Sequence, residues 1–205
     1  VPPWPWVFPD EIGLDDFEGM GEGQIPSSYQ IEEIQKAANH FAAYSLVSSI
    51  FFTCENWDNL SADEAAGCGW ESLLRFTQRA WRRPLNDAEI TRLETYWNQT
   101  RSETTLPEAI ALTVSAVLQS PAFVFKIEEG NSSQPENEAV ALSGWEMASR
   151  LSYFLWDSMP DAELFGAAAN GELSSADGVA SQARRMLENP KARTAVIDFH
   201  HQLLG

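Results

Sequence analysis

Helix-capping residues recur along the chain, and each stands three positions before an acid or an amide. The pairs are Ser27/Gln30, Ser61/Glu64, Asn86/Glu89, Thr105/Glu108, Ser143/Glu146, Ser158/Asp161 and Ser174/Asp177. At this spacing the cap oxygen accepts from an unpaired backbone N–H, and the second side chain reaches back to the N–H of the cap. Apolar residues at helical spacing follow most pairs, so the pattern predicts an all-α protein, an irregular multi-helix bundle.

The first half of the chain is expected to form helices separated by short breaks. They run from near Ser28 to near Phe51, through 70–81 to a stop at Pro84, from Asn86 onward, and from near Leu106 to Pro121. Proline ends helices because it lacks the backbone N–H. The apolar run Phe123–Ile127 fits either another helical turn or an extended piece, because it is too short for periodicity to decide.

The stretch 129–138 contains Gly130, Asn131, Ser132, Ser133, Gln134 and Pro135 and no apolar residue, and it is the best candidate linker in the chain. Further helices are expected near 143–156, 159–166, 175–188 and 190–204, the last with Asn189 as cap and Pro190 in its first turn. We therefore divide the sequence into a helical domain over 27–128, the linker, and a second helical domain over 139–205 that is expected to continue beyond the chain end.

Residues 1–26 are predicted to form an extended arm, because prolines and glycines interrupt any regular pattern there. Trp4, Trp6 and neighbouring apolar residues favour packing of this Pro/Trp-rich arm against the helical body or a partner chain. An alternative is that Trp4, Trp6 or Trp57 stacks on a sugar, which would make the chain a glycan-binding module.

The protein is strongly acidic, with a formal net charge of −17 over 205 residues. Such a charge favours solubility and repels phosphate backbones and anionic lipid surfaces, so we expect no nucleic-acid partner. No apolar run approaches the roughly 20 residues that span a bilayer. The N-terminus lacks the basic-then-apolar layout of a signal peptide, so any signal is expected upstream of Val1.

Two cysteines, Cys54 and Cys68, flank a polar loop. A disulfide between them would stabilise the fold by roughly 3 kcal/mol in the chain-entropy model and would indicate a periplasmic or extracellular location. The alternative is two unrelated buried thiols. Neither cysteine lies in a C-x-x-C-H sequence, so no c-type haem is attached to this chain, and no other cofactor is expected on it.

Four segments carry a family resemblance. Residues 76–89 (FTQRAWRRPLNDAE) resemble the signature F-x-R-R-A-Y-R-R-P-L-T-x-x-E, and 118–125 (LQSPAFVF) resemble L-x-S-P-x-F-L-F. Residues 148–164 (ASRLSYFLWDSMPDAEL) are similar to the longest signature of the same family, and 184–193 (RRMLENPKAR) to the part that follows it. The chain thus resembles large secreted bacterial multidomain proteins of the domain-of-unknown-function 1592/1595 type, which are planctomycete-like.

The resemblance covers most of the chain, from about Phe8 to Gly205, although 199–204 reads FHHQLL where the family has F-x-x-Q-W-L. It implies that the chain is an interior portion of a longer polypeptide, with the remaining domains or a companion chain of the same protein as partners. The family has no agreed catalytic residues, so the resemblance assigns none here.

Acidic residues among glycines suggest a weak calcium site. Asp15, Asp16, Glu18 and Glu22 offer the hard oxygen ligands that calcium prefers, but their spacing is wrong for an EF-hand, and a solvated acidic loop is the favoured interpretation. His200 and His201 point about 100° apart on a helix, and His40 has no partner motif, so no metal site is expected from the histidines.

Arginines near two signature segments form a candidate cluster for ligand binding or structural pinning. Arg150, Tyr153 and Asp157 are neighbours on one helix face, where Arg150 can pair with Asp157 while Tyr153 covers its stem. Arg79, Arg82 and Arg83 precede Pro84 at a helix end, where cations interact favourably with the helix dipole. For both groups structural pinning is the favoured interpretation.

The sequence contains no nucleophile beside a base and no phosphate-binding glycine loop, so no catalytic residue is assigned. The favoured hypothesis is a helical structural or interaction module of a secreted protein. One alternative is a portion of a redox or polymer-degrading enzyme whose catalytic residues or cofactor lie on other segments. The other is the glycan-binding module.

Overall fold

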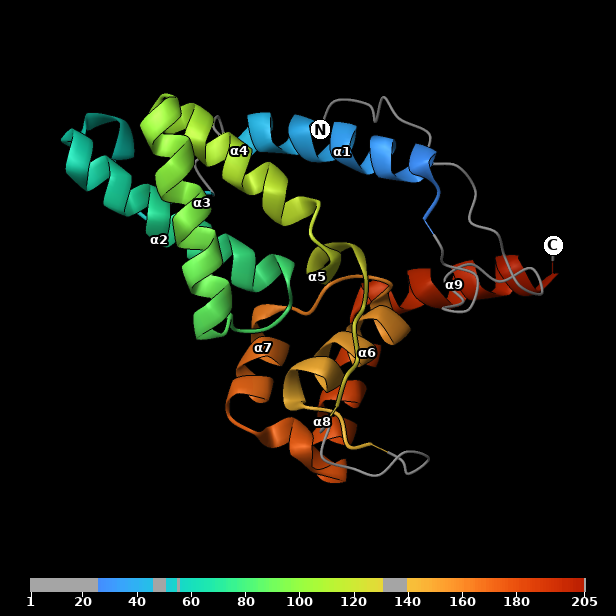
Figure 1. The fold of residues 1–205 in the computed structure, drawn as a ribbon. Helices are drawn as coiled ribbons and strands as arrows, with labels where there is room; N and C mark the ends of the chain where they lie inside the picture. The colour runs from blue at the N-terminus through green and yellow to red at the C-terminus, as the bar shows by residue number, and fades with distance from the viewer. Residues whose placement is uncertain (1–25, 46–50, 55, 131–139, 205) are drawn as a thin grey trace. The chain divides into compact units, whose positions relative to one another are not determined.

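The computed structural model describes residues 26–45, 51–54, 56–130 and 140–204, and Figure 1 draws their fold. These residues form helices joined by turns and loops, with no strand among them, which confirms the prediction of an all-α multi-helix protein. The N-terminal arm, apart from Pro26, and most of the polar stretch 129–138 lie outside the described residues. No helix within the described ranges has the length and apolar character that crossing a membrane requires.

The described residues form two compact units, with the boundary between Phe125 and Lys126. The first contains α1 (Ser28–Ser45), the 3-10 turn η2 (Trp57–Asn59), α2 (Ala62–Ala80), α3 (Asp87–Glu103), α4 (Leu106–Leu118) and the single turn α5 (Pro121–Val124). The second contains α6 (Gly144–Trp156), α7 (Ala162–Ala169), η3 (Glu172–Ser174), α8 (Ala176–Leu187) and α9 (Pro190–Leu204).

Helix α4 lies at the centre of the first unit, where α1, α2 and α3 all pack against it. Ile110 and Val114 on α4 are fully buried, together with Leu73 of α2 and Trp97 of α3. Small residues allow the close approach of these helices, since Gly69 of α2 lies opposite Ile110 and Trp97. The core of this unit therefore forms around a helix that is apolar on several faces.

Helix α6 has the corresponding role in the second unit, where it contacts α7, α8, α9 and η3. Its buried stripe includes Ala148 and Trp156, which pack with Leu164 of α7 and Met186 of α8. The indole N–H of Trp156 donates to the carbonyl oxygen of Met186 at 2.8 Å, so the polar atom of this buried ring is satisfied.

Five of the predicted helix starts are confirmed as reciprocal caps. The cap residues are Ser27, Ser61, Asn86, Thr105 and Ser143, each paired with the acid or amide three positions later. The start of α9 is confirmed as well, because the side chain of Asn189 accepts from the N–H of Lys191 at 3.1 Å. Capping is a local effect, which is why the sequence pattern predicts these starts.

Two predicted caps are wrong. Helix α7 begins after Asp161 rather than Ser158, because the Asp161 carboxylate accepts from the N–H of Leu164 at 2.8 Å. Helix α8 is capped by Ser175, not Ser174, and the Ser175 hydroxyl accepts from the N–H of Gly178 at 3.1 Å. A Cβ on Gly178 would collide with the carbonyl oxygen of Glu172, so this close start requires glycine.

The first helix, predicted from near Ser28 to near Phe51, is described as far as Ser45, and the residues 46–50 lie outside the described ranges. Phe51 itself lies in a turn and packs into the core beside Phe52. For the apolar run after Pro121, the sequence left open a helical turn or an extended piece, and the structure contains both. It makes the turn α5 and then becomes extended at Phe125.

Candidate functional site

The predicted disulfide between Cys54 and Cys68 is present, with the two Cα atoms 6.0 Å apart. It closes a loop that contains η2, and inside this loop Trp57 stacks on Phe52 with ring centroids 4.0 Å apart. The loop is tied to α2 a second time, because the N–H of Thr53 donates to the hydroxyl of Ser72 at 3.0 Å. The disulfide thus fastens this loop to the core of the first unit.

Arg82, one of the predicted cluster residues, is buried at the end of α2 and has a left-handed backbone with φ of 60°. Its guanidinium donates to the carbonyl oxygens of Ala122 and Phe125 at 2.8 Å each, and to those of Phe123 and Ala80 at 3.2 and 3.1 Å. Most of these carbonyls belong to α5 or to the residue after it, where helix ends leave acceptors unpaired. Arg82 therefore caps α5 with its side chain.

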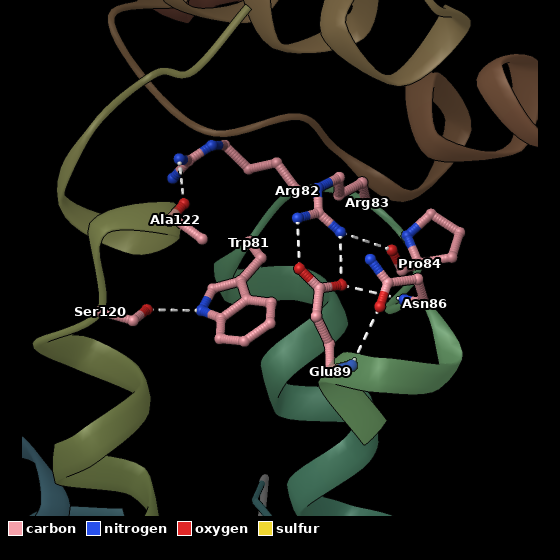
Figure 2. A network of polar contacts seen from close by, with 8 residues as sticks. All are labelled: Trp81, Arg82, Arg83, Pro84, Asn86, Glu89, Ser120 and Ala122. Carbon is pink, nitrogen blue, oxygen red and sulfur yellow. Dashed lines mark hydrogen bonds and ion pairs between the residues drawn. The ribbon is translucent and has the colours of Figure 1, made fainter. Parts of the chain in front are cut away.

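Trp81, next to Arg82 in the sequence, also connects the end of α2 to the start of α5. Its indole N–H donates to the hydroxyl of Ser120 at 2.7 Å, as Figure 2 shows beside the contact of Arg82 with Ala122. Ser120 precedes Pro121, the first residue of α5. The first two signature segments, 76–89 and 118–125, therefore bind each other directly through Trp81 and Arg82.

Arg83 turns toward the start of α3, where its guanidinium forms a bidentate ion pair with Glu89 at 2.8 and 2.7 Å. Glu89 also completes the cap of α3 with Asn86. The hydrogen bonds from Arg83 hold the pKa of Glu89 below its usual range, against the opposing effect of burial. Arg79, the third predicted arginine of this group, lies exposed in the last turn of α2.

A comparable ion pair joins the other two signature segments in the second unit. The guanidinium of Arg185 donates to both carboxylate oxygens of Asp161 at 2.8 and 3.1 Å, and it contacts Glu163 at 3.1 Å. Arg185 and Lys191 also approach the face of Trp156, at 5.7 and 5.1 Å from its ring centre. Burial works to raise the pKa of Asp161, but hydrogen bonds from Arg185 and Leu164 outweigh it, so this pKa is lowered.

The predicted group around Arg150 has different partners from those that helix spacing suggested. Arg150 pairs with Glu128, its Nε donating to Glu128 Oε1 at 3.0 Å, rather than with Asp157. Asp157 instead ends α6 as a C-cap with φ of 47°. Tyr153 lies under the ammonium of Lys126, which is 4.5 Å from its ring centre.

The other candidate residues concern possible metal binding and sugar stacking, and the structure describes only some of them. Among the described residues, no three His, Cys, Asp or Glu side chains gather into a metal-binding group. The calcium candidates Asp15, Asp16, Glu18 and Glu22 lie outside the described ranges, as do Trp4 and Trp6. His200 and His201 are exposed on α9, and Nδ1 of His200 lies 2.7 Å from the carbonyl oxygen of Val196.

Several polar residues of these networks were not among the sequence candidates, namely Glu89, Glu128, Glu146, Asp161 and Arg185. Glu89 and Glu146 were visible only as members of capping pairs, and Asp161 was assigned to the wrong cap. The resemblance pointed to the segments of Asp161 and Arg185, but their pairing across 24 positions has no sequence signal. The networks connect elements within each unit, which is the geometry of structural pinning.

Comparison with known proteins connects these networks to two family regions. Residues 68–128 match the family described as Protein of unknown function (DUF1595), and residues 142–205 match Protein of unknown function (DUF1592). No curated protein and no solved structure matches the chain. The matched regions contain the arginine networks of both units, and the chain is a protein of the DUF1592/DUF1595 type.

Proposed function

We propose that this chain is a helical structural and interaction module of a secreted multidomain bacterial protein. The observation that carries the proposal is an apolar stripe on α9 that begins in the core and continues along the helix through half-exposed side chains. Ala192, 4% exposed, packs into the core of the second unit. Further along the same helix face, Val196 and Leu203 are 52 and 54% exposed, and Phe199 between them contacts the ring of His200.

The stripe follows the spacing of a helix that buries one face. Its members recur at intervals of four, three and four residues from Ala192, as in the helices that pack inside the two units. Burying such a side chain contributes about 1.5–3 kcal/mol, so a partner that covers Val196 and Leu203 would be bound with useful affinity. A contiguous exposed apolar face of this kind is typical of interaction surfaces.

The arginine networks support the structural part of the proposal. Three arginines of the signature segments bind carbonyl or carboxylate oxygens of their own unit. Arg82 donates to α5, Arg83 pairs with Glu89, and Arg185 pairs with Asp161. An arginine held in this way positions helices. The segments that carry the family resemblance therefore serve to maintain the shape of each unit.

The proposed partner of α9 is a neighbouring domain or companion chain of the same protein, and the proposed location is periplasmic or extracellular. The disulfide Cys54–Cys68 supports the location, because such bonds form and persist in oxidising compartments. The family resemblance supports the partner, because it implies further domains around this region.

Native mass spectrometry of the protein purified from its source, with and without reductant, tests this proposal. We expect the chain within a larger polypeptide or assembly. Where the partner of α9 is held by non-covalent contacts, we expect V196D and L203D to weaken that association. Phe154→Asp is the matched control, because Phe154 is a 79% exposed apolar residue on a different helix, α6. A lone species of 22.8 kDa, or association unaffected by the α9 variants, would contradict the proposal.

A further inference from the structure

The segment Lys126–Gly130 runs alongside α6 and is held there at three successive points. Lys126 lies over the ring of Tyr153, and Glu128 pairs with Arg150. The backbone N–H groups of Glu129 and Gly130 both donate to Oε1 of Glu146, at 2.8 and 2.9 Å. In Figure 1 the segment is the yellow chain that passes beside α6.

The three partners on α6 share one helix face. Glu146, Arg150 and Tyr153 are separated by four and three positions, the spacing of neighbours along a helix surface. The segment meets them in reverse order as it proceeds, so it lies antiparallel to α6 and fastens at each turn. Glu146 is the strongest of the three points, because one carboxylate accepts from the amides of both Glu129 and Gly130 and also caps α6 through Ser143.

Gly130, the last residue of the segment, lies close to Val140. Its φ of 58° is in the left-handed region, and a Cβ there would collide with the side chain of Val140. Gly130 and Val140 are therefore in close contact, although nine residues separate them in the sequence. The two described residues on either side of the stretch 131–139 therefore lie against each other, and both belong to the second unit.

The N-terminal end of the segment is also fixed by contacts, on both sides of the Phe125–Lys126 bond. The carbonyl oxygen of Phe125 accepts from Arg82 in the first unit, and Lys126 already contacts Tyr153 in the second. We propose that Lys126–Gly130 is a strap belonging to the second unit, with Glu146 as its latch. Within the described residues the chain then passes from the first unit to the second at the Phe125–Lys126 bond. Glu129 and Gly130, the first two residues of the predicted linker 129–138, belong to the strap.

Amide hydrogen exchange of the full chain, resolved by NMR, tests the strap at its two latch amides. We expect the amides of Glu129 and Gly130 to be protected, and Glu146→Ala to reduce their protection by about tenfold or more. Glu108→Ala is the matched control, because Glu108 completes an equivalent cap with Thr105 on α4 and touches no strap. Exchange of both amides at the unprotected rate in the native chain, or unchanged protection in E146A, would overturn the proposal.

Tryptic cleavage after Lys126 provides a second measure that leaves the cap of α6 intact. Arg150→Ala removes the pairing with Glu128 and retains Glu146 and Ser143. We expect cleavage of the folded full chain at the Lys126–Ile127 bond to become about two- to fivefold faster, the scale of an exposed ion pair. Glu128→Ala, with the same pairing removed from the other side, is expected to match it. No acceleration in either variant would overturn the strap.

Discussion

Arg82 donates a hydrogen bond to the carbonyl oxygen of Phe125 at 2.8 Å, across 43 positions of the chain. The same guanidinium also donates to the carbonyl oxygens of Ala80, Ala122 and Phe123, and only 6% of Arg82 is exposed. Buried carbonyl groups need partners, and here one side chain supplies partners to the end of α2 and to α5 together. The left-handed backbone of Arg82 aims the side chain at this place.

Removing this side chain is expected to destabilise the first unit strongly. Arg82→Ala removes the donor from one buried and three partly buried hydrogen bonds, and we expect the free energy of unfolding to fall by about 2–4 kcal/mol. Arg82→Lys should recover only part of the loss, because an ammonium is a point charge and does not span the carbonyls as a planar guanidinium does. Urea unfolding followed by circular dichroism measures both variants.

The control for this experiment is Arg79→Ala, which removes an exposed arginine from the last turn of the same helix. It should change the free energy of unfolding by no more than about 0.5 kcal/mol. Equal effects of the Arg79 and Arg82 variants would show that the carbonyl contacts contribute little.

Local chemistry explains which parts of the fold were predictable. A Ser, Thr or Asn cap with its acid three positions later is complete within one helical turn, so the starts at Ser61, Asn86 and Ser143 could be inferred from the sequence. The choice between Ser174 and Ser175 could not, because it depends on the close approach of Gly178 to Glu172, which only the folded chain shows.

The arginine partners were beyond the sequence for a different reason. The acceptors of Arg82 are main-chain carbonyls, which every residue possesses, so nothing in the amino-acid pattern distinguishes Ala122 from other positions. The pairing of Arg150 was predicted on its own helix with Asp157, yet a carboxylate from outside the helix, Glu128, is bound instead. Spacing along one helix identifies neighbours but gives no information on segments that return from elsewhere.

Acid is expected to weaken the first unit through Glu89. Its pKa is lowered in the fold, chiefly by hydrogen bonds from Arg83, so the unfolded chain binds a proton more readily. The stabilising contribution is therefore complete above the ordinary glutamate pKa of about 4.3 and is lost as the pH falls through the lower pKa of the folded state. We expect the free energy of unfolding to decrease over this acidic window.

Glu89→Gln isolates this contribution, because glutamine retains the capping geometry at the third helical position and loses the charge. We expect E89Q to be less stable at pH 7 by about 1–2 kcal/mol and to show a flatter decline below pH 5. Glu94→Gln, at an exposed position of the same helix, removes an equal charge as a control. Parallel pH profiles for the native chain and E89Q would contradict the role of the Arg83 pair.

Loss of the disulfide is expected to destabilise the first unit and to leave the second unchanged. Opening the 14-position loop between Cys54 and Cys68 by C54S/C68S should cost about 3 kcal/mol in the chain-entropy model. Hydrogen exchange should accelerate in the loop that holds Trp57 and in the adjoining part of α2, while the amides of α6 and α8 keep their native rates. Unchanged exchange around Trp57 would mean that the stacking on Phe52 and the bond from Thr53 to Ser72 suffice to hold the loop.

Asp161 combines two roles that substitution can separate, since its carboxylate both caps α7 and pairs with Arg185. Asparagine is as good a helix cap as aspartate, so Asp161→Asn removes the ion pair alone, whereas Asp161→Ala removes both contributions. We expect thermal unfolding to rank the native chain above D161N and D161N above D161A, with about 1 kcal/mol between the two variants for the lost cap.

Glu163→Gln is the control, because Glu163 reaches Arg185 from a more exposed position and should have a smaller effect. If D161N and D161A were equally stable, the cap would contribute nothing, and α7 would be held by the burial of Leu164, Ala167 and Ala168. If D161N matched the native chain, the bidentate contact with Arg185 would have no energetic role in joining α7 to α8.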